Sequence, residues 1–180
     1  PLAFARLGVI VAGTGVILFF AANWREMAPI VKLAVLFGGM WGVYLAAGFA
    51  LARPDSSANG LAQALLLLGT ILFGANINLI AQIYHISGHY PDAILLWSLG
   101  ALVMAWLARS QPAAVLGLLV LAVWSGMEMF AFRNYFHWPF LVVWVLFLPA
   151  IVMGRWRFAA GTALLLLLLY LILQTVSYLF

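Results

Sequence analysis

The sequence predicts an all-α protein, a polytopic bundle of about seven transmembrane helices, and three observations support this. Of the 180 residues, 68% are hydrophobic and only 7% are charged, whereas a soluble domain is about 45–50% apolar and about 25% charged. The apolar residues form long runs, and a spanning helix needs about 20 of them. Runs such as Leu164–Leu169 lack the alternation of barrel strands. A soluble or disordered chain is therefore excluded.

The composition also excludes several functions. The chain has no cysteine, so disulfides, thiolate chemistry and cysteine-based zinc sites are impossible. It has no basic tract of the kind that follows a nucleic-acid backbone. We therefore expect the lipid bilayer as a partner, together with a membrane-protein partner or a second copy of the chain, and no nucleic acid.

Polar breaks divide the chain into spans that together form a single transmembrane domain. Four prolines, at positions 29, 91, 112 and 139, stand at the starts of apolar runs, where a missing N–H group costs nothing. Pro54 follows the end of a run, as expected after a helix. The sixth span is the shortest. The predicted spans are Leu2–Ala22, Pro29–Ala52, Leu61–Ile83, Pro91–Ala108, Pro112–Phe130, Pro139–Met153 and Phe158–Phe180.

Two features concern the N-terminal part of the chain. The chain begins at Pro1 rather than at methionine, and we expect that an N-terminal portion is missing. The stretch Gly13–Asn23 resembles Gly69–Asn76, and each is followed by a polar loop and a returning span. This similarity indicates a duplicated helical hairpin, although chance similarity is an open alternative in apolar sequence of low complexity.

The distribution of basic residues predicts an orientation. Seven spans place five arginines on the N-terminal side and three basic residues on the other side. By the positive-inside rule, the N-terminus is cytoplasmic and the C-terminus lies outside. The first group is Arg6, Arg53, Arg109, Arg155 and Arg157, and the second is Arg25, Lys32 and Arg133.

Polar side chains collect at the predicted outer end of the bundle. Asn78, Gln82 and His85 have the spacing i, i+4, i+7 of one helical stripe. An unpaired amide facing lipid costs several kcal/mol, so these groups should face other helices or a wet cavity. Glu128 also needs a partner, for which we expect Arg25 or Arg133.

We therefore predict an outward-facing polar pocket lined by the first, third, fifth and seventh spans. Its predicted ligand-binding residues are Asn23, Arg25, Asn76, Asn78, Gln82, His85, Glu128 and Arg133. The alternative is structural, because amides within bundles often serve only to hold helices together, at about 1 kcal/mol or less each.

Metal binding and catalysis have weaker support from the sequence. A metal site would use His85, His89 and His137, with Asp92 or Glu128 as a further candidate, but the i, i+4 spacing of the first two requires a helix that Ser87-Gly88 and Pro91 argue against. We therefore predict no metal site and no cofactor. No Gly-x-Ser-x-Gly elbow is present, and we name no catalytic residue.

Two stretches resemble a family of bacterial membrane proteins, the domain of unknown function 2157 family. They are Ile17–Trp24 and Leu79–His85, and Leu95–Trp97 with the span after it also fits. The resemblance covers about Arg6–Trp124. It implies a bacterial inner-membrane location and a cytosolic segment before the first span, and it implies no activity.

Three hypotheses of function follow. The first is binding or passage of a small polar or lipid-headgroup ligand in the outward pocket, as in a transporter. The alternative is a non-enzymatic assembly or scaffold subunit of a membrane complex. The third, a membrane-embedded enzyme acting on a lipid-linked substrate, has the least support because no catalytic spacing is present.

Overall fold

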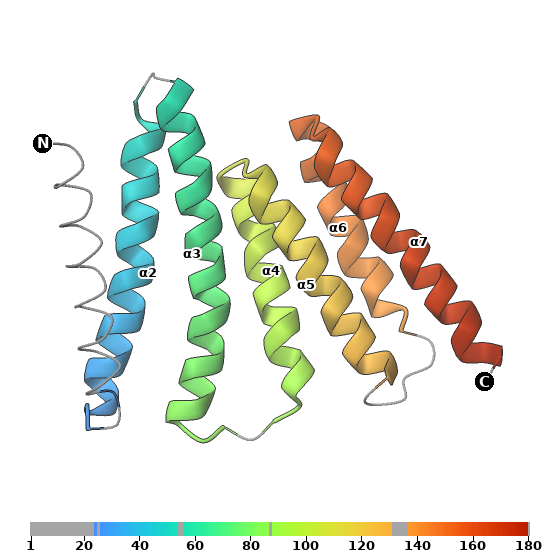
Figure 1. Cartoon of the computed structure of the whole chain (residues 1–180), viewed down its shortest axis with the longest axis horizontal. Helices are drawn as coiled ribbons and strands as arrows, with labels where there is room; N and C mark the ends of the chain where they lie inside the picture. The colour runs from blue at the N-terminus through green and yellow to red at the C-terminus, as the bar shows by residue number, and fades with distance from the viewer. Residues whose placement is uncertain (1–23, 25, 54–55, 87, 131–136, 180) are drawn as a thin grey trace, which may run out of the picture. The chain divides into compact units, whose positions relative to one another are not determined.

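A computed structural model shows only α-helices among the residues that it describes, which are 24, 26–53, 56–86, 88–130 and 137–179 (Figure 1). The helices follow one another along the chain with short connections. They are α2 (Pro29–Leu51), α3 (Ser56–Ile83), α4 (Tyr90–Leu107), α5 (Gln111–Phe130), α6 (Pro139–Gly154) and α7 (Arg157–Leu179).

The helix boundaries agree with the predicted spans to within one residue at most ends. The exception is α3, which begins at Ser56 rather than at Leu61, because the polar residues after Pro54 continue the helix beyond the apolar run. The first predicted span and the first copy of the predicted repeat lie outside the described residues. The duplicated hairpin therefore stays a prediction.

The count of seven spans is not confirmed. Five of the described helices, α2, α3, α4, α5 and α7, are long and apolar enough to cross a membrane. The sixth, α6, has 16 residues, which corresponds to a length of about 24 Å. This is less than the hydrocarbon core of about 30 Å. The chain is thus a helical membrane protein with several spans.

The chain divides into two compact units, Pro1–Gly38 and Gly39–Phe180. In the first unit, the ammonium group of Lys32 lies 5.6 Å from the ring centroid of Trp24, a cation–π contact. The second unit contains the core and the candidate site. A single transmembrane domain stays a prediction.

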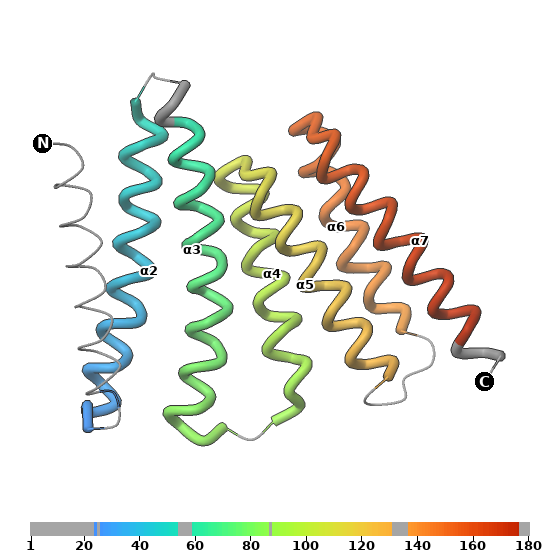
Figure 2. Tube along the Cα trace, viewed as in Figure 1, coloured from blue at the N-terminus to red at the C-terminus, as the bar shows by residue number. Residues whose placement is uncertain are grey.

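Helix α5 is at the centre of the second unit and contacts α3, α4, α6 and α7. It packs most extensively on α4, and the two form a hairpin (Figure 2). Small buried residues allow the close approach of these two helices, and the Ser98 hydroxyl donates to the Gly117 carbonyl across the contact at 3.0 Å. The small residues are Ala101, Ala105, Ala113, Ala114 and Gly117.

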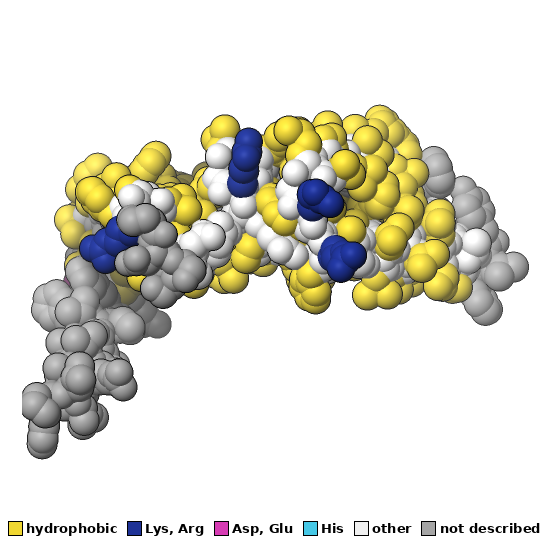
Figure 3. Space-filling view, turned by 90° about the horizontal axis from the view of Figure 1, so that it is seen from above, with side chains coloured by type: hydrophobic (Ala, Val, Ile, Leu, Met, Phe, Trp, Pro, Cys, Tyr) yellow, Lys and Arg dark blue, Asp and Glu magenta, His cyan; other side chains and the backbone are white. Residues whose placement is uncertain are grey.

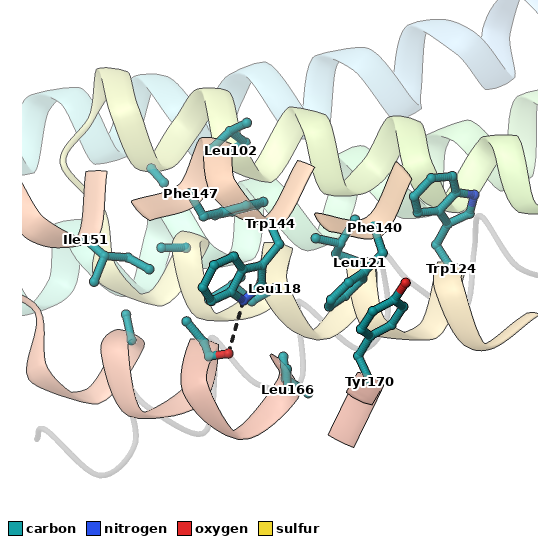
Figure 4. Close-up of a cluster of buried hydrophobic side chains, with 14 of the residues drawn as sticks. Leu102, Leu118, Leu121, Trp124, Phe140, Trp144, Phe147, Ile151, Leu166 and Tyr170 are labelled. Carbon is teal, nitrogen blue, oxygen red and sulfur yellow. Dashed lines mark hydrogen bonds between the residues drawn. The ribbon is translucent and has the colours of Figure 1, made fainter. Parts of the chain in front are cut away.

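Large side chains fill the space between α5, α6 and α7 (Figure 4). The rings of Phe140 and Tyr170 are stacked with their centroids 4.5 Å apart. The Trp144 indole N–H donates to the Ala163 carbonyl at 3.0 Å, which satisfies a polar group that is otherwise buried. These two contacts fix α6 on α7.

The two ends of the second unit differ in charge. One end carries the connections from α4 to α5 and from α6 to α7, with Arg109, Arg155 and Arg157. Figure 3 looks onto this end and shows its basic side chains. The opposite end carries His85, His89 and the rest of the candidate site.

Candidate functional site

A cleft of about 830 Å³ lies where α3 ends and α4 begins. Its lining combines apolar side chains with amide, imidazole, phenol and carboxyl groups. The polar lining residues are Asn78, Gln82, His85, His89, Tyr90 and Asp92.

Helix α3 ends immediately before the polar loop. The His85 N–H donates to the Gln82 carbonyl at 3.4 Å, and the Ile86 N–H donates to the Ala81 carbonyl at 2.9 Å. These two bonds form a Schellman motif. Its left-handed position is occupied by His85, with φ of 51°, where glycine is usual because a Cβ is strained there. The predicted stripe therefore ends at Gln82, and His85 reaches the cleft from the turn.

The start of α4 carries the next two polar groups. His89 is the N-cap residue, and Pro91 is buried in the first turn. The Asp92 N–H donates to the His89 carbonyl at 3.0 Å, so one tight turn holds both side chains. The Asp92 carboxylate also lies near the positive end of the helix dipole, which favours a negative charge.

Glu128 of α5 is paired with a histidine. Its Oε1 atom lies 2.5 Å from His89 Nε2, and its side chain is only 12% exposed. A carboxylate oxygen of Asp92 lies within 4.8 Å of a ring nitrogen of His89 and of a carboxylate oxygen of Glu128. Neither expected partner of Glu128, Arg25 or Arg133, lies within the described residues. The His89–Glu128 pair was not predicted, because residues 39 positions apart share no helical spacing.

His137 belongs to a second polar cluster, which it forms with Ser125 and Tyr170. Its Nδ1 atom lies 3.1 Å from the Ser125 hydroxyl, and its carbonyl accepts a hydrogen bond of 3.1 Å from the Tyr170 hydroxyl. Its ring meets Trp124 edge to face at 4.4 Å. Burial lowers the pKa of His137 below its usual value, and the charge of Glu128 opposes this shift. His137 is thus a structural residue whose neutral form fits its site.

Of the remaining predicted site residues, one is described by the structure and three are not. Asn76 is buried, and its amide group lies 3.6 Å from the Met40 sulfur, so it does not line the cleft. Asn23, Arg25 and Arg133 fall outside the described residues. His85 and His89 both line the cleft, and His89 also contacts Glu128. His137 is instead buried beside Ser125, so the three histidines do not form one group.

The fold defines a polytopic helical membrane protein with a cleft of mixed apolar and polar lining at one end. A family model described as "Predicted membrane protein (DUF2157)" matches residues 1–114. The chain belongs to the domain of unknown function 2157 family. The matched part contains the whole cleft lining but not Glu128. No curated protein and no solved structure matches the chain.

Proposed function

We propose that the chain binds a small polar or lipid-headgroup ligand in the cleft between α3 and α4. The observation that carries this proposal is the composition of the cleft, which combines apolar side chains with amide, imidazole and carboxyl groups. A concave site with an apolar wall and a few convergent polar groups is the usual form of a small-molecule site. At the end of a membrane bundle, the same composition suits a lipid whose headgroup contacts the polar lining residues.

The charges favour a ligand with an ammonium group. Asp92 lines the cleft, and Glu128 contacts His89, which also lines it. Among the described residues of the second unit, the arginines are at the opposite end of the bundle. A carboxylate and an ammonium group attract each other most strongly away from bulk water. Phosphatidylethanolamine carries such a group, and phosphatidylglycerol does not.

The extent of the cleft favours binding rather than passage. Its lining runs only from Ile77 to Leu96, which covers the last turns of α3 and the first turns of α4. Further along these two helices, Trp97 of α4 packs against Gly74 of α3, and Phe73 of α3 packs against Gly100 of α4. A ligand in the cleft therefore reaches only one end of the bundle and does not pass through it.

Binding is tested by the thermal stability of the full chain with added lipid. We expect phosphatidylethanolamine to raise the melting temperature more than phosphatidylglycerol, because a ligand that binds only the folded state stabilises it. Asn78→Leu and Gln82→Leu should each lose most of the difference. The matched control is Asn59→Leu, which changes an exposed amide near the other end of α3. Equal shifts for Gln82→Leu and the wild type would refute the proposal.

We also propose that the histidine end faces outward, since the arginine end is the cytoplasmic one by the positive-inside rule. The chain has no cysteine, so single cysteines report on topology without background. Gly88→Cys and Met153→Cys place exposed thiols at opposite ends of the bundle. In intact cells, a membrane-impermeant maleimide should label Gly88→Cys and leave Met153→Cys unlabelled. The reverse pattern would invert the orientation.

A further inference from the structure

Three potential metal ligands come together beside the cleft, one from the N-cap of α4, one from its first turn and one from α5. His89, Asp92 and Glu128 each offer one ligand atom, and these atoms lie within 4.8 Å of one another. We propose that this group binds a divalent transition-metal ion, with Zn²⁺ as its experimental probe. The proposal goes beyond the headgroup site and does not rest on it.

The backbone holds the three groups in place. His89 and Asp92 belong to one turn, which is closed by the hydrogen bond from the Asp92 N–H to the His89 carbonyl and anchored by the buried Pro91. Glu128 comes from α5, the helix that packs most extensively on α4. Ligands on packed helices keep their geometry better than ligands on loops.

The charge balance of the group favours a cation. Two carboxylates this close repel each other. The contact with His89 Nε2 involves only one oxygen of Glu128. The described arginines of this unit lie at the other end of the bundle. A divalent ion would neutralise both carboxylates at once.

The donor set indicates which ion fits. One imidazole nitrogen and two carboxylate oxygens suit Zn²⁺ or Mn²⁺, which accept mixed nitrogen and oxygen ligands. Zinc ligands lie about 2.0–2.2 Å from the ion and hence, in tetrahedral geometry, about 3.4 Å from one another. His89 and Glu128 must therefore separate slightly, which the 38% exposed side chain of His89 permits. The remaining coordination positions would hold water or a ligand.

The test is isothermal titration of ZnCl₂ into the full chain in detergent, with any affinity tag removed and bound metal stripped by EDTA. We expect one zinc ion per chain. Asp92→Asn should weaken binding at least about tenfold, since even groups that only support a ligand contribute 10–100-fold. Asp92 is exposed, so this variant should fold. The controls are Glu26→Gln, which changes another exposed acid, and His85→Gln, which changes the neighbouring histidine.

The outcomes separate this proposal from the headgroup site. Absence of binding heat would overturn it, and so would unchanged affinity in both Asp92→Asn and His89→Gln. If His85→Gln alone abolished binding, the site would be elsewhere in the cleft and the assignment wrong. Gln82→Leu should bind zinc like the wild type while losing the effect of phosphatidylethanolamine, so either proposal can fail alone.

Discussion

Gly117→Ala should destabilise the bundle by about 1–3 kcal/mol, the usual cost of overpacking a core. A Cβ added at Gly117 would lie 2.6 Å from Phe147 Cζ and 2.9 Å from Ala101 Cβ. Both neighbours are fully buried and lie on different helices, so neither is free to move away. The free energy of unfolding in a detergent titration measures the effect.

A second glycine on the same helix provides the control. A Cβ at Gly126 would meet nothing within 4 Å among the described residues. Gly126→Ala should therefore stabilise α5 by up to about 1 kcal/mol, because alanine is the better helix former. The two substitutions are chemically identical and should have opposite signs. Equal effects would mean that α4, α5 and α6 do not pack as described.

His137→Ala should cost about 2 kcal/mol or more. It removes the contact with Ser125 Oγ, where a hydrogen bond is worth about 1 kcal/mol. It also removes the edge-to-face contact with Trp124, worth roughly 0.5–1.5 kcal/mol, and leaves a cavity. Thermal unfolding of the purified variant measures the loss. The exposed His85 is the comparison, since His85→Ala removes no buried contact.

The same residue should make stability depend on pH. Burial lowers the pKa of His137 in the folded state, below its unfolded value of about 6.5. The unfolded chain then binds more protons, so stability is complete above about pH 6.5 and falls as the pH drops below it. In EDTA-containing buffer, His137→Gln should show a smaller decrease between neutral and acidic pH than the wild type. An unchanged decrease would assign the effect to another group.

Much of the helical arrangement follows from the sequence alone. Proline and arginine positions placed the ends of α2 and α4–α7 within one residue, because a proline suits a first helical turn and a charged residue marks the water interface. The predicted start of α3 was wrong, because the apolar run on which the prediction was based is shorter than the helix. The sixth segment was correctly placed, but its helix has only 16 residues, fewer than the roughly 20 that a membrane-spanning helix needs.

The candidate site was only partly accessible to sequence reasoning. Helical spacing related Asn78 to Gln82, and both line the cleft. It misassigned His85 to the helix, because a left-handed turn at a non-glycine residue carries no strong sequence signal. The pairing of His89 with Glu128 depends on how α4 packs on α5, which spacing does not encode. Asn76 shares the polar character of its neighbours but faces Met40 instead.

The convergence of polar groups from α4 and α5 is tested most directly by a distance measurement. Solid-state NMR of the full chain in lipid, with ¹⁵N-labelled histidine and ¹³C-labelled glutamate, reports the dipolar coupling between His89 Nε2 and the Glu128 carboxyl carbon. The 2.5 Å separation of Nε2 and Oε1 predicts a strong coupling that disappears in Glu128→Gln, which lacks the labelled carboxylate. If the wild type shows no such coupling, the two side chains do not meet, and the site described here does not form.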